Sequence, residues 1–390
     1  MNVLGWTLMI IALTGLGLFL VVNPLTTWLA TCLSPARQKP AKVPGLSASL
    51  LIVVRNGREL IGPKLDNTLA LATPQGGLEI IVHSDGSDDG TDELVSSYAD
   101  RGVRLCSTSG HRGKAFGLNA AAALSTGDVL IFSDADALLA PQALLLLMPW
   151  FSDPRVGGVC GRRVVPDKAG AFEAAQAGYA TLDSRLKAWE SRLGALTSND
   201  GKLYAVRREL FPEIPDAVTD DLYAALAVVS AGRLFLFDPE ARVRVAVPSR
   251  SPAVELRRRR RIVSTSLNAI ALNRALLNPL RHGFYSLRLL LNKVARRLMP
   301  VFLLLLLAGS ALASLESALA VLLLAGQACC MVLAASFQLF LSRRNGLASR
   351  IAGAAFYFYV GNLGMLWGLV DFFRGNLPKR WNPEKGEAAP

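Results

Sequence analysis

The sequence predicts an α/β protein with a mostly parallel sheet and with α-helical transmembrane segments at both ends. Between residues 48 and 249, short apolar runs rich in β-branched side chains alternate with helical patterns. This alternation is typical of right-handed βαβ units, which build parallel sheets. Long runs without a charged side chain flank this stretch, and such runs are typical of helices that cross a bilayer.

The membrane segments are predicted from charge and length. Four runs of the chain lack charged side chains: 1–36, 298–315, 317–342 and 351–370. At about 1.5 Å per helical residue, each run is long enough for a hydrocarbon core of about 30 Å. The first run lacks a basic start and is too long for a cleaved signal peptide. We therefore expect an anchor at 1–36, three transmembrane segments within 298–373, and a tail at 374–390.

The net charge of +12 comes from one short region. Residues 37–249 hold 23 Lys and Arg against 25 Asp and Glu, whereas residues 250–297 hold 12 basic side chains and one acid, Glu255. Because the folded domain is nearly neutral, nucleic acid is not an expected partner. Basic residues directly before an apolar run match the positive-inside rule and attraction to anionic lipid. We expect a basic amphipathic interface region at 250–297 and a cytoplasmic domain at 48–249, on a multi-pass protein of the inner membrane.

The tail complicates this topology. Four crossings with a cytoplasmic middle place both chain ends outside, yet residues 374–390 carry four basic side chains. Basic residues favour the cytoplasmic side. A re-entrant or interfacial course for one of the C-terminal runs therefore stays an alternative.

The elements of the domain follow from its hydrophobic pattern. In the first half, strands are expected at 50–54, 79–83, 103–106 and 129–132, with helices between them at 58–72, 91–98 and 113–124. In the second half, strands are expected at 156–165 and 203–206, and helices at 172–192 and 219–231. Residues 234–237 and 243–247 are expected to pair as a short hairpin.

Two aspartates follow the strand at 129–132. Asp134 and Asp136 are two residues apart, so an extended backbone directs both carboxylates to the same side. Ligands in open α/β sheets collect beyond the carboxyl ends of strands. Paired carboxylates there suit a hard divalent cation that also holds a diphosphate. The competing interpretation, a loop that caps the next helix, has about equal weight for this motif alone.

Asp85 closes the strand at 79–83 and has the same relation to its strand as Asp134, so we expect it to be a ligand. Asp88 and Asp89 follow in a glycine-containing turn, where capping of the next helix is the preferred interpretation. Lys114 stands with Gly113 at the start of the next predicted helix, a place that suits a phosphate. Asn119, about one turn later, is a candidate for the same face.

Two further charged motifs follow. Asp220 and Asp221 begin the helix predicted at 219–231, where Thr219 or Asp220 would be the N-cap and the other acid would face a cleft. Five consecutive arginines, Arg257–Arg261, fit a solvated face, a lipid-headgroup contact or a diphosphate contact. The last two roles are compatible if different arginines face the membrane and the site.

Taken together, these motifs resemble those of the membrane-bound family-two glycosyltransferases, the relatives of cellulose, chitin and hyaluronan synthases. The matching segments, in chain order, are Ser49–Glu59, His83–Thr91, Ser133–Asp136, Thr197–Leu210, Thr219–Asp221 and Arg258–Ile262. The resemblance implies the GT-A nucleotide-diphospho-sugar transferase fold. It also implies an inverting transfer from a nucleotide sugar, with a UDP-sugar as the expected donor, to a lipid, lipid-linked or polysaccharide acceptor.

The resemblance also implies residue roles. The implied nucleotide-sugar-binding residues are Asp85, Lys114, Asp134, Arg258 and Arg261. Asp136 would hold a Mg²⁺ or Mn²⁺ ion, and Asp221 would deprotonate the acceptor hydroxyl. A cation and an arginine would stabilise the charge that develops on the departing nucleoside diphosphate.

The chain departs from the family pattern at several positions. Asp220 replaces a glutamate, Arg258 replaces a glutamine, and Ile262 stands where polymer synthases have a tryptophan that stacks on the acceptor sugar. The missing tryptophan weakens the case for a processive enzyme, so addition of one or a few sugars is at least as well supported. The alternative is a catalytically degenerate membrane scaffold of a polysaccharide-export complex, which retention of the four key aspartates disfavours.

Overall fold

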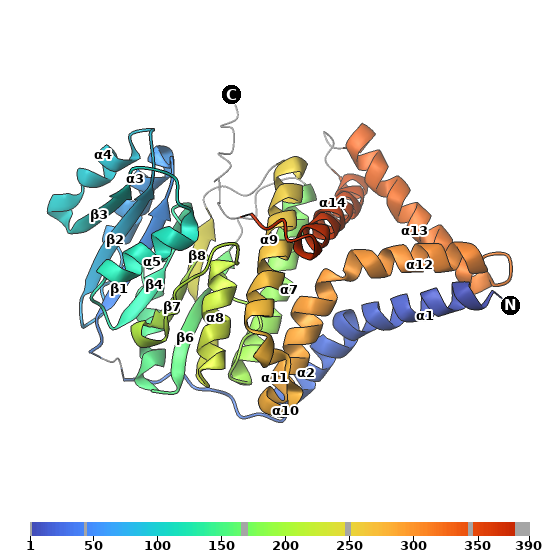
Figure 1. Ribbon diagram of the computed structural model, residues 1–390, viewed down its shortest axis with the longest axis horizontal. Coiled ribbons are helices and arrows are strands. Elements are labelled where there is room, and N and C mark those ends of the chain that lie inside the picture. Colours follow the sequence, from blue (N-terminus) through green and yellow to red (C-terminus); the bar gives the residue numbers. More distant parts are fainter. Residues whose placement is uncertain (1, 43–44, 165–170, 246–250, 342–345, 379–390) are drawn as a thin grey trace.

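The computed structural model describes residues 2–42, 45–164, 171–245, 251–341 and 346–378. A sheet covered by helices lies at one end of the molecule, and long apolar helices lie at the other (Figure 1). The strands are β1 (Ala48–Val54), β2 (Leu78–Asp85), β3 (Val103–Thr108), β4 (Val129–Phe132), β5 (Ala137–Leu139), β6 (Val156–Val164), β7 (Tyr204–Arg207) and β8 (Leu234–Val245). The helices of this part are α3 (Arg58–Leu69), α4 (Thr91–Ser96), α5 (Lys114–Leu124), α6 (Ala143–Leu147), α7 (Ala171–Arg192) and α8 (Asp220–Ser230).

The eight strands form one mixed sheet in the order β3-β2-β1-β4-β7-β6-β8-β5. The neighbours β3, β2, β1 and β4 are all parallel, which confirms the βαβ prediction for the first half. In the second half, β7 is antiparallel to both β4 and β6, β5 is antiparallel to β8, and β6 is parallel to β8. The parallel half places the ends of β1, β2 and β4 at one edge, where the motif residues gather.

The predicted hairpin at 234–247 is wrong, because this segment forms the continuous strand β8 as far as Val245. Its pairing with β6 jumps from Gly161–Asp238 to Arg162–Arg242, so residues 239–241 bulge out of the ladder. Both halves of β8 then pair with the same neighbour. Pro239 within the bulge explains why the sequence pattern resembles a turn, since proline cannot donate to a ladder.

The sheet is buried on both faces. Leu50 and Ile52 of β1 pack into the cluster that includes residues of α3 and α6. The alternate residues Leu51 and Val53 pack into a second cluster with residues of α5 and α8. Because successive side chains of a strand point to opposite faces, burial on both sides requires the uninterrupted apolar run seen in β1.

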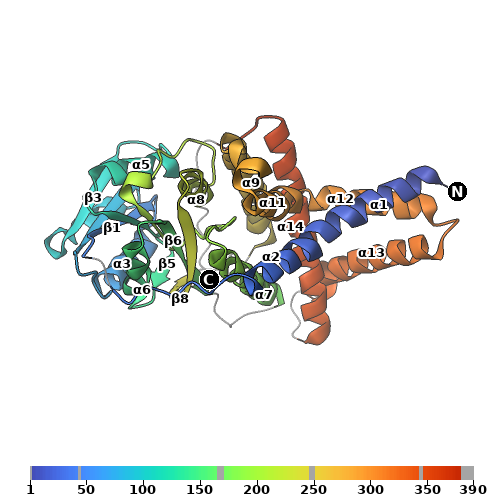
Figure 2. The same ribbon diagram turned by 90° about the horizontal axis from the view of Figure 1, so that it is seen from below.

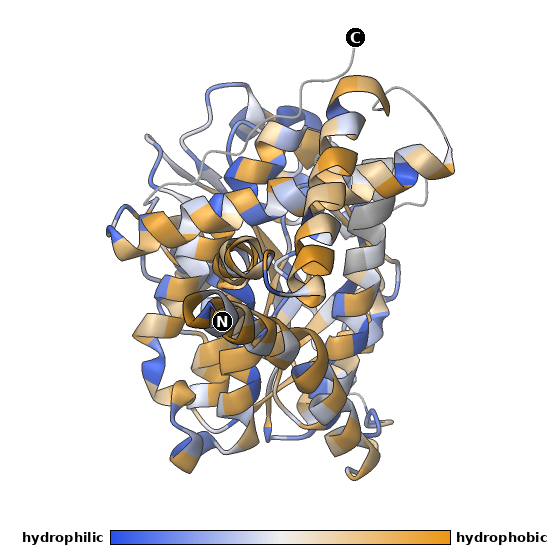
Figure 3. Cartoon of the chain, turned by 90° about the vertical axis from the view of Figure 1, so that its right-hand side faces the viewer, coloured by the Kyte–Doolittle hydropathy of each residue, from blue (hydrophilic) through white to orange (hydrophobic). Residues whose placement is uncertain are grey.

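The remaining helices build the apolar end of the molecule. They are α1 (Val3–Gly17), α2 (Asn23–Cys32), α9 (Pro252–Leu272), α10 (Pro279–His282), α11 (Phe284–Leu289), α12 (Met299–Ala313), α13 (Ala318–Ser336) and α14 (Leu347–Phe373). Within the described residues, three helices are long and apolar enough to cross a membrane: Val3–Cys32, Ala318–Leu341 and Leu347–Phe373. Viewed from this end, the helices are orange over much of their surface (Figure 3). Helices of this kind therefore stand at both ends of the chain, as predicted.

The run at 298–315 differs from the prediction of a separate span. Its helix, α12, has 15 residues, fewer than a spanning helix needs. It follows the helical segment Phe284–Ala295, and the two are bent by 64° relative to each other. The two segments are long and apolar enough to cross a membrane only when they are taken together. Pro300 in the first turn of α12 marks where the new helix begins. Of the predicted tail, residues 379–390 lie outside the described part.

Helix α9, which carries the arginine run, lies between the domain and α14 (Figures 1 and 2). Two glycines of α14 allow a close approach. A Cβ on Gly364 would lie 2.7 Å from the carbonyl oxygen of Leu256, and one on Gly368 would lie 2.5 Å from that of Arg260. The region predicted as an amphipathic interface thus contains a helix that is packed against a candidate membrane span. The first residue of the predicted interface region, at position 250, lies outside the described residues.

Candidate functional site

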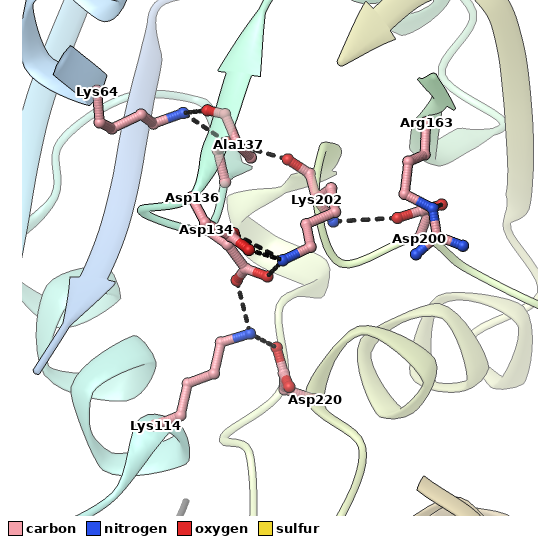
Figure 4. A network of polar contacts seen from close by, with 10 residues as sticks. Lys64, Lys114, Asp134, Asp136, Ala137, Arg163, Asp200, Lys202 and Asp220 are labelled. Atoms are coloured by element: carbon pink, nitrogen blue, oxygen red, sulfur yellow. Dashed lines mark hydrogen bonds and ion pairs between the residues drawn. The ribbon is translucent and has the colours of Figure 1, made fainter. Parts of the chain in front are cut away.

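Asp134 and Asp136 lie on the turn between β4 and β5, and their carboxylates converge on one cation (Figure 4). The ammonium of Lys202 lies 3.0 Å from Asp134 Oδ2 and 2.7 and 2.8 Å from the two carboxylate oxygens of Asp136. This convergence confirms that the two side chains share one side of the backbone. The next helix, α6, has Gln142 as its N-cap residue, so neither aspartate caps it.

Lys64 fixes the turn from behind. Its fully buried ammonium donates to Ser133 Oγ and to the Ala137 carbonyl oxygen, both at 2.7 Å. Burial lowers the pKa of Lys64 to about 7, although the nearby Asp134 and Asp136 oppose that shift. The sequence interpretation missed this residue. The feature of the sequence that could have revealed it is a lysine among the buried positions of α3, next to Leu65.

Lys114 joins the turn that carries Asp134 to the start of α8. Its ammonium lies 2.9 Å from Asp134 Oδ1 and 3.0 Å from Asp220 Oδ2. Burial disfavours the charged form, but the two carboxylates raise the pKa of Lys114 above its ordinary value. Burial likewise opposes charge on Asp134, yet Lys114 and Lys202 hold the pKa of Asp134 below its usual range. These groups therefore form a charged network at neutral pH.

Asp221 stands beside that network with different electrostatics. Burial and the neighbouring Asp220 raise the pKa of Asp221 to about 6. The N-cap residue of α8, Thr219, does not cap with its side chain, because its hydroxyl bonds to Thr265 of α9 at 2.7 Å. A Cβ on Gly201 would lie 3.5 Å from Asp221 Oδ2, so the glycine leaves open the space beside this carboxylate.

The arginine run divides between two faces of α9. Arg259 donates to Glu255 Oε1 at 2.7 Å and to the Tyr357 hydroxyl of α14 at 2.6 Å. Arg260 pairs with Asp371 of α14, and Arg258 lies 3.0 Å from Glu255 Oε2.

Arg261 faces the site instead. Burial lowers the pKa of Arg261, and the opposing influences come first from Asp220 and then from Asp134 and Asp221. Arg261 is therefore in electrostatic contact with the site acids. Its role in holding a diphosphate stays a prediction.

Asp85 uses both carboxylate oxygens within the protein. Oδ1 accepts from the Arg112 backbone N–H at 2.6 Å, and Oδ2 accepts from that of Gly113 at 2.8 Å. The Nδ1 atom of His111 also lies 2.8 Å from Oδ2. Asp85 thus holds the loop that leads into α5. Its contact with a nucleotide base stays a prediction, and the structure adds this positioning role.

Two secondary predictions have clear outcomes. Asp89 accepts from the backbone N–H groups of Arg58 and Thr91, each at 3.2 Å, so it caps helices as predicted. Asn119 does not line the site. It exchanges two hydrogen bonds with the backbone of Ile214, at 2.8 and 2.9 Å, and so fixes the loop before α8.

Asp134 and Asp136 fit a divalent cation by their chemistry. Carboxylate oxygens are the ligands that Mg²⁺ and Mn²⁺ prefer, and these two side chains already meet at one positive charge. Among the residues that the structure describes, no group of three or more His, Cys, Asp or Glu side chains is placed to hold a metal. A metal ion held by Asp134 and Asp136 would take its other ligands from phosphate oxygens and water, as is usual for magnesium sites at nucleotides.

Comparison with known proteins shows what the domain is similar to. The family model of glycosyl transferase family 2 matches residues 49–214. The beta-monoglucosyldiacylglycerol synthase of Trichormus variabilis is 28% identical over 183 residues, covering 45% of this chain and 39% of that protein. The poly-beta-1,6-N-acetyl-D-glucosamine synthase of Staphylococcus epidermidis is 26% identical over 195 residues, covering 49% and 46%. The matches thus span less than half the length of these relatives.

A solved structure resembles nearly the whole chain. The mannosyltransferase PcManGT from Pyrobaculum calidifontis, in complex with GDP-Man and Mn²⁺, superposes with a TM-score of 0.68 at 24% identity. The match covers 94% of this chain and 99% of that one. At this identity the likeness establishes the fold, which is the GT-A fold expected from the motifs. Residues 49–214, somewhat less than half of the chain, are thus similar in sequence to glycosyl transferase family 2.

Proposed function

We propose that the protein is an inverting, metal-dependent glycosyltransferase that moves a sugar from a nucleoside-diphosphate sugar to the hydroxyl of a lipid or lipid-linked acceptor. One observation carries the proposal. Lys114 bridges Asp134 and Asp220 at 2.9 and 3.0 Å, which brings the cation-binding carboxylates within one side chain of the helix that carries Asp221.

The donor side follows from charge. The diphosphate lies at Asp134 and Asp136, with Arg261 facing it from α9. When bound, Mg²⁺ or Mn²⁺ supplies positive charge to the phosphate oxygens as the nucleoside diphosphate departs. The guanidinium of Arg261 adds a second fixed positive charge, which is worth more in a buried site than in water.

The acceptor side requires a base, and Asp221 has the properties of one. With a pKa raised to about 6, its carboxylate is ionised at neutral pH and is still more basic than an ordinary aspartate. Asp221 takes the proton of the acceptor hydroxyl while that oxygen bonds to the anomeric carbon. The bond from this carbon to the diphosphate breaks on the opposite side. A single displacement of this kind inverts the anomeric configuration.

The acceptor class follows from the surroundings of the site. Helix α9 carries Arg261 and packs at backbone distance on the candidate membrane span α14, so the chemistry takes place beside the apolar helices. The relative from T. variabilis is named for a diacylglycerol-linked product, which supports a lipid acceptor here. The basic region before the C-terminal helices supports a site on the cytoplasmic face of the inner membrane. Ile262 in place of a stacking tryptophan supports addition of one or a few sugars.

A donor panel tests the proposal. The full chain in detergent is incubated with UDP- and GDP-linked sugars, Mn²⁺ and extracted membrane lipid, and released nucleotide and glycolipid are measured. Both donor classes belong in the panel, because the sequence favours UDP and the structural neighbour holds GDP-Man. We expect one donor to yield a β-linked product from an α-linked sugar. Absence of turnover with every donor would favour the scaffold alternative, and an α-linked product would contradict the single displacement.

A further inference from the structure

We infer that Lys202 is a built-in counter-cation that occupies the metal position of the nucleotide-free enzyme and makes metal binding conditional on a nucleoside diphosphate. Resting on the proposed function, this inference concerns the order of loading at the same site. Lys202 belongs to the loop before β7, on the acceptor side, and no role was predicted for it from the sequence.

The geometry leaves room for one cation at these carboxylates. The Lys202 ammonium lies within 3.0 Å of Asp134 Oδ2 and of both Asp136 oxygens. A Mg²⁺ ion bound to the same oxygens at about 2.1 Å would lie next to this ammonium. Two like charges at such a distance repel strongly in a site shielded from water. The Lys202 side chain must therefore leave its place before the two aspartates hold a metal together.

Lys202 is better suited to such a movement than the other two lysines of the site. Lys64 is fully buried and donates to a hydroxyl and a carbonyl oxygen behind the turn. Lys114 is shared between Asp134 and Asp220, so a swing would break the link to α8. The Lys202 side chain, 20% exposed against 19% for Lys114, pairs with two carboxylates of a single turn, so its movement would not break a link between that turn and a helix.

The backbone of Lys202 is fixed, and its side chain has four carbons about which it can rotate. Its carbonyl oxygen accepts from Ser133 Oγ at 3.0 Å, and β7 begins two residues later at Tyr204. Rotation about the four-carbon side chain is therefore sufficient to move the ammonium, and the loop need not shift. The preceding Gly201 has no side chain to obstruct this rotation.

A nucleoside diphosphate resolves the conflict between the two cations. Its phosphate oxygens add negative charge beside Asp134 and Asp136, so both the displaced ammonium and a metal ion find partners. Without the nucleotide, a metal ion that takes over the two carboxylates leaves the displaced Lys202 ammonium without either of its ion-pair partners. The diphosphate and the metal should therefore bind with positive coupling, and Lys202 should be its source.

Metal titration without sugar transfer tests the inference. Mn²⁺ binding to the detergent-solubilised full chain is measured by electron paramagnetic resonance, with and without UDP or GDP. In the original chain we expect Mn²⁺ alone to bind at least ten-fold more weakly than with nucleotide. In Lys202→Met, Mn²⁺ alone should bind at least ten-fold more tightly than in the original chain, and the effect of nucleotide should shrink. Lys202→Gln, which also removes the charge, provides a second variant of the same kind.

Three matched variants assign the effect. Lys202→Arg keeps the charge and should retain weak metal binding without nucleotide. Adding Asp136→Asn to Lys202→Met should abolish the gain, which places the ion at these carboxylates. Lys42 is an exposed lysine of the described region, and Lys42→Met should bind Mn²⁺ as the original chain does.

Unchanged or weaker Mn²⁺ binding in both charge-removing variants would overturn the inference, as would an equal gain in Lys202→Arg. Failure of this inference and failure of the proposed function give different results. If Mn²⁺ affinity changes as expected but the protein transfers no sugar, the inference about Lys202 stands and the proposed transferase function is contradicted. If the protein transfers sugar but Mn²⁺ affinity does not change in the Lys202 variants, the transferase function stands and the inference is contradicted.

Discussion

Arg260 of α9 and Asp371 of α14 form an ion pair, with Arg260 Nη2 2.8 Å from Asp371 Oδ1. The same guanidinium lies 5.9 Å from the ring centre of Trp367. Arg260 directly precedes Arg261, which faces the site acids. Because consecutive helical residues point in directions about 100° apart, the contact with α14 fixes the rotation of α9 and with it the direction of Arg261. The candidate membrane span α14 thus helps to set the direction of Arg261 toward the proposed donor site.

The first prediction concerns this pair. Arg260→Ala should reduce the free energy of unfolding more than Asp371→Asn, because it leaves a mostly buried carboxylate without its charge partner. The coupling between the two changes should be about 1 kcal/mol or less, since the Arg260 side chain is 48% exposed. Unfolding of the detergent-solubilised chain, followed by tryptophan fluorescence, measures both quantities. Equal effects of the two single changes would show that Asp371 is adequately solvated without Arg260.

The second prediction separates Arg261 from the rest of the run. Arg261→Ala should weaken UDP or GDP binding roughly ten- to hundred-fold, the equivalent of about 1.5–3 kcal/mol for a hydrogen bond to a charged group. Arg257→Ala, a change at an exposed position of the same helix, is the matched control and should leave nucleotide affinity near its original value. Isothermal titration in one detergent compares them. Similar small losses in both variants would place the diphosphate on Lys114 and the metal instead.

The third prediction concerns Arg259, which holds two groups together. Its guanidinium contacts the fully buried carboxylate of Glu255 and the Tyr357 hydroxyl. Arg259→Ala should lower thermal stability, because it removes one partner of a buried charge, while nucleotide affinity changes little. Arg259→Lys should recover part of the stability, since it restores the charge without the second donor. A loss of nucleotide affinity with unchanged stability would contradict this division of the run.

The fourth prediction is a pH dependence. Asp221 acts as a base only when ionised, and burial together with Asp220 raises its pKa to about 6. The turnover number should therefore be constant above this value and should fall as the pH is lowered through about 6. Asp221→Asn should lose about 10²–10⁴-fold in turnover while nucleotide affinity is kept. A profile that stays flat down to pH 5, or a variant that loses nucleotide binding, would remove Asp221 from the role of base.

Local patterns predicted much of the fold and part of the site. The paired direction of Asp134 and Asp136 follows from the two-residue period of extended chain at a strand end. The alternation of strands with helices also predicted the parallel half of the sheet. Asp85 and Asp134 were found because each follows a strand.

Other features depend on contacts that no local pattern encodes. Lys202 is a lysine in a loop, and only the fold brings it to Asp136, 66 residues away. The course of β8 depends on its shared neighbour β6, so a proline in its middle resembles a turn in sequence. The division of the arginine run likewise needed α14, about 100 residues later in the chain, to show which side chains have partners there.

The last prediction concerns Asp136 itself. Asp136→Ala removes two of the oxygens that meet at the cation position, so transfer and its dependence on Mn²⁺ should both be lost. The fold should persist, because the side chain is 28% exposed and belongs to a turn. Turnover is measured over a Mn²⁺ titration that begins with EDTA, and circular dichroism checks the fold.

Asp88→Ala is the matched control for Asp136→Ala. Asp88 is an exposed aspartate in the turn after β2, a parallel strand of the same sheet, so its removal should leave the metal titration unchanged. Nucleotide binding is measured as well, because Arg261, Lys114 and Asp134 remain in Asp136→Ala. We expect the variant to retain weak nucleotide affinity that no longer rises with Mn²⁺. Full turnover of Asp136→Ala in EDTA would show that Asp136 holds no catalytic metal, and the permanent positive charge of Lys202 would then be the cation on which the chemistry depends.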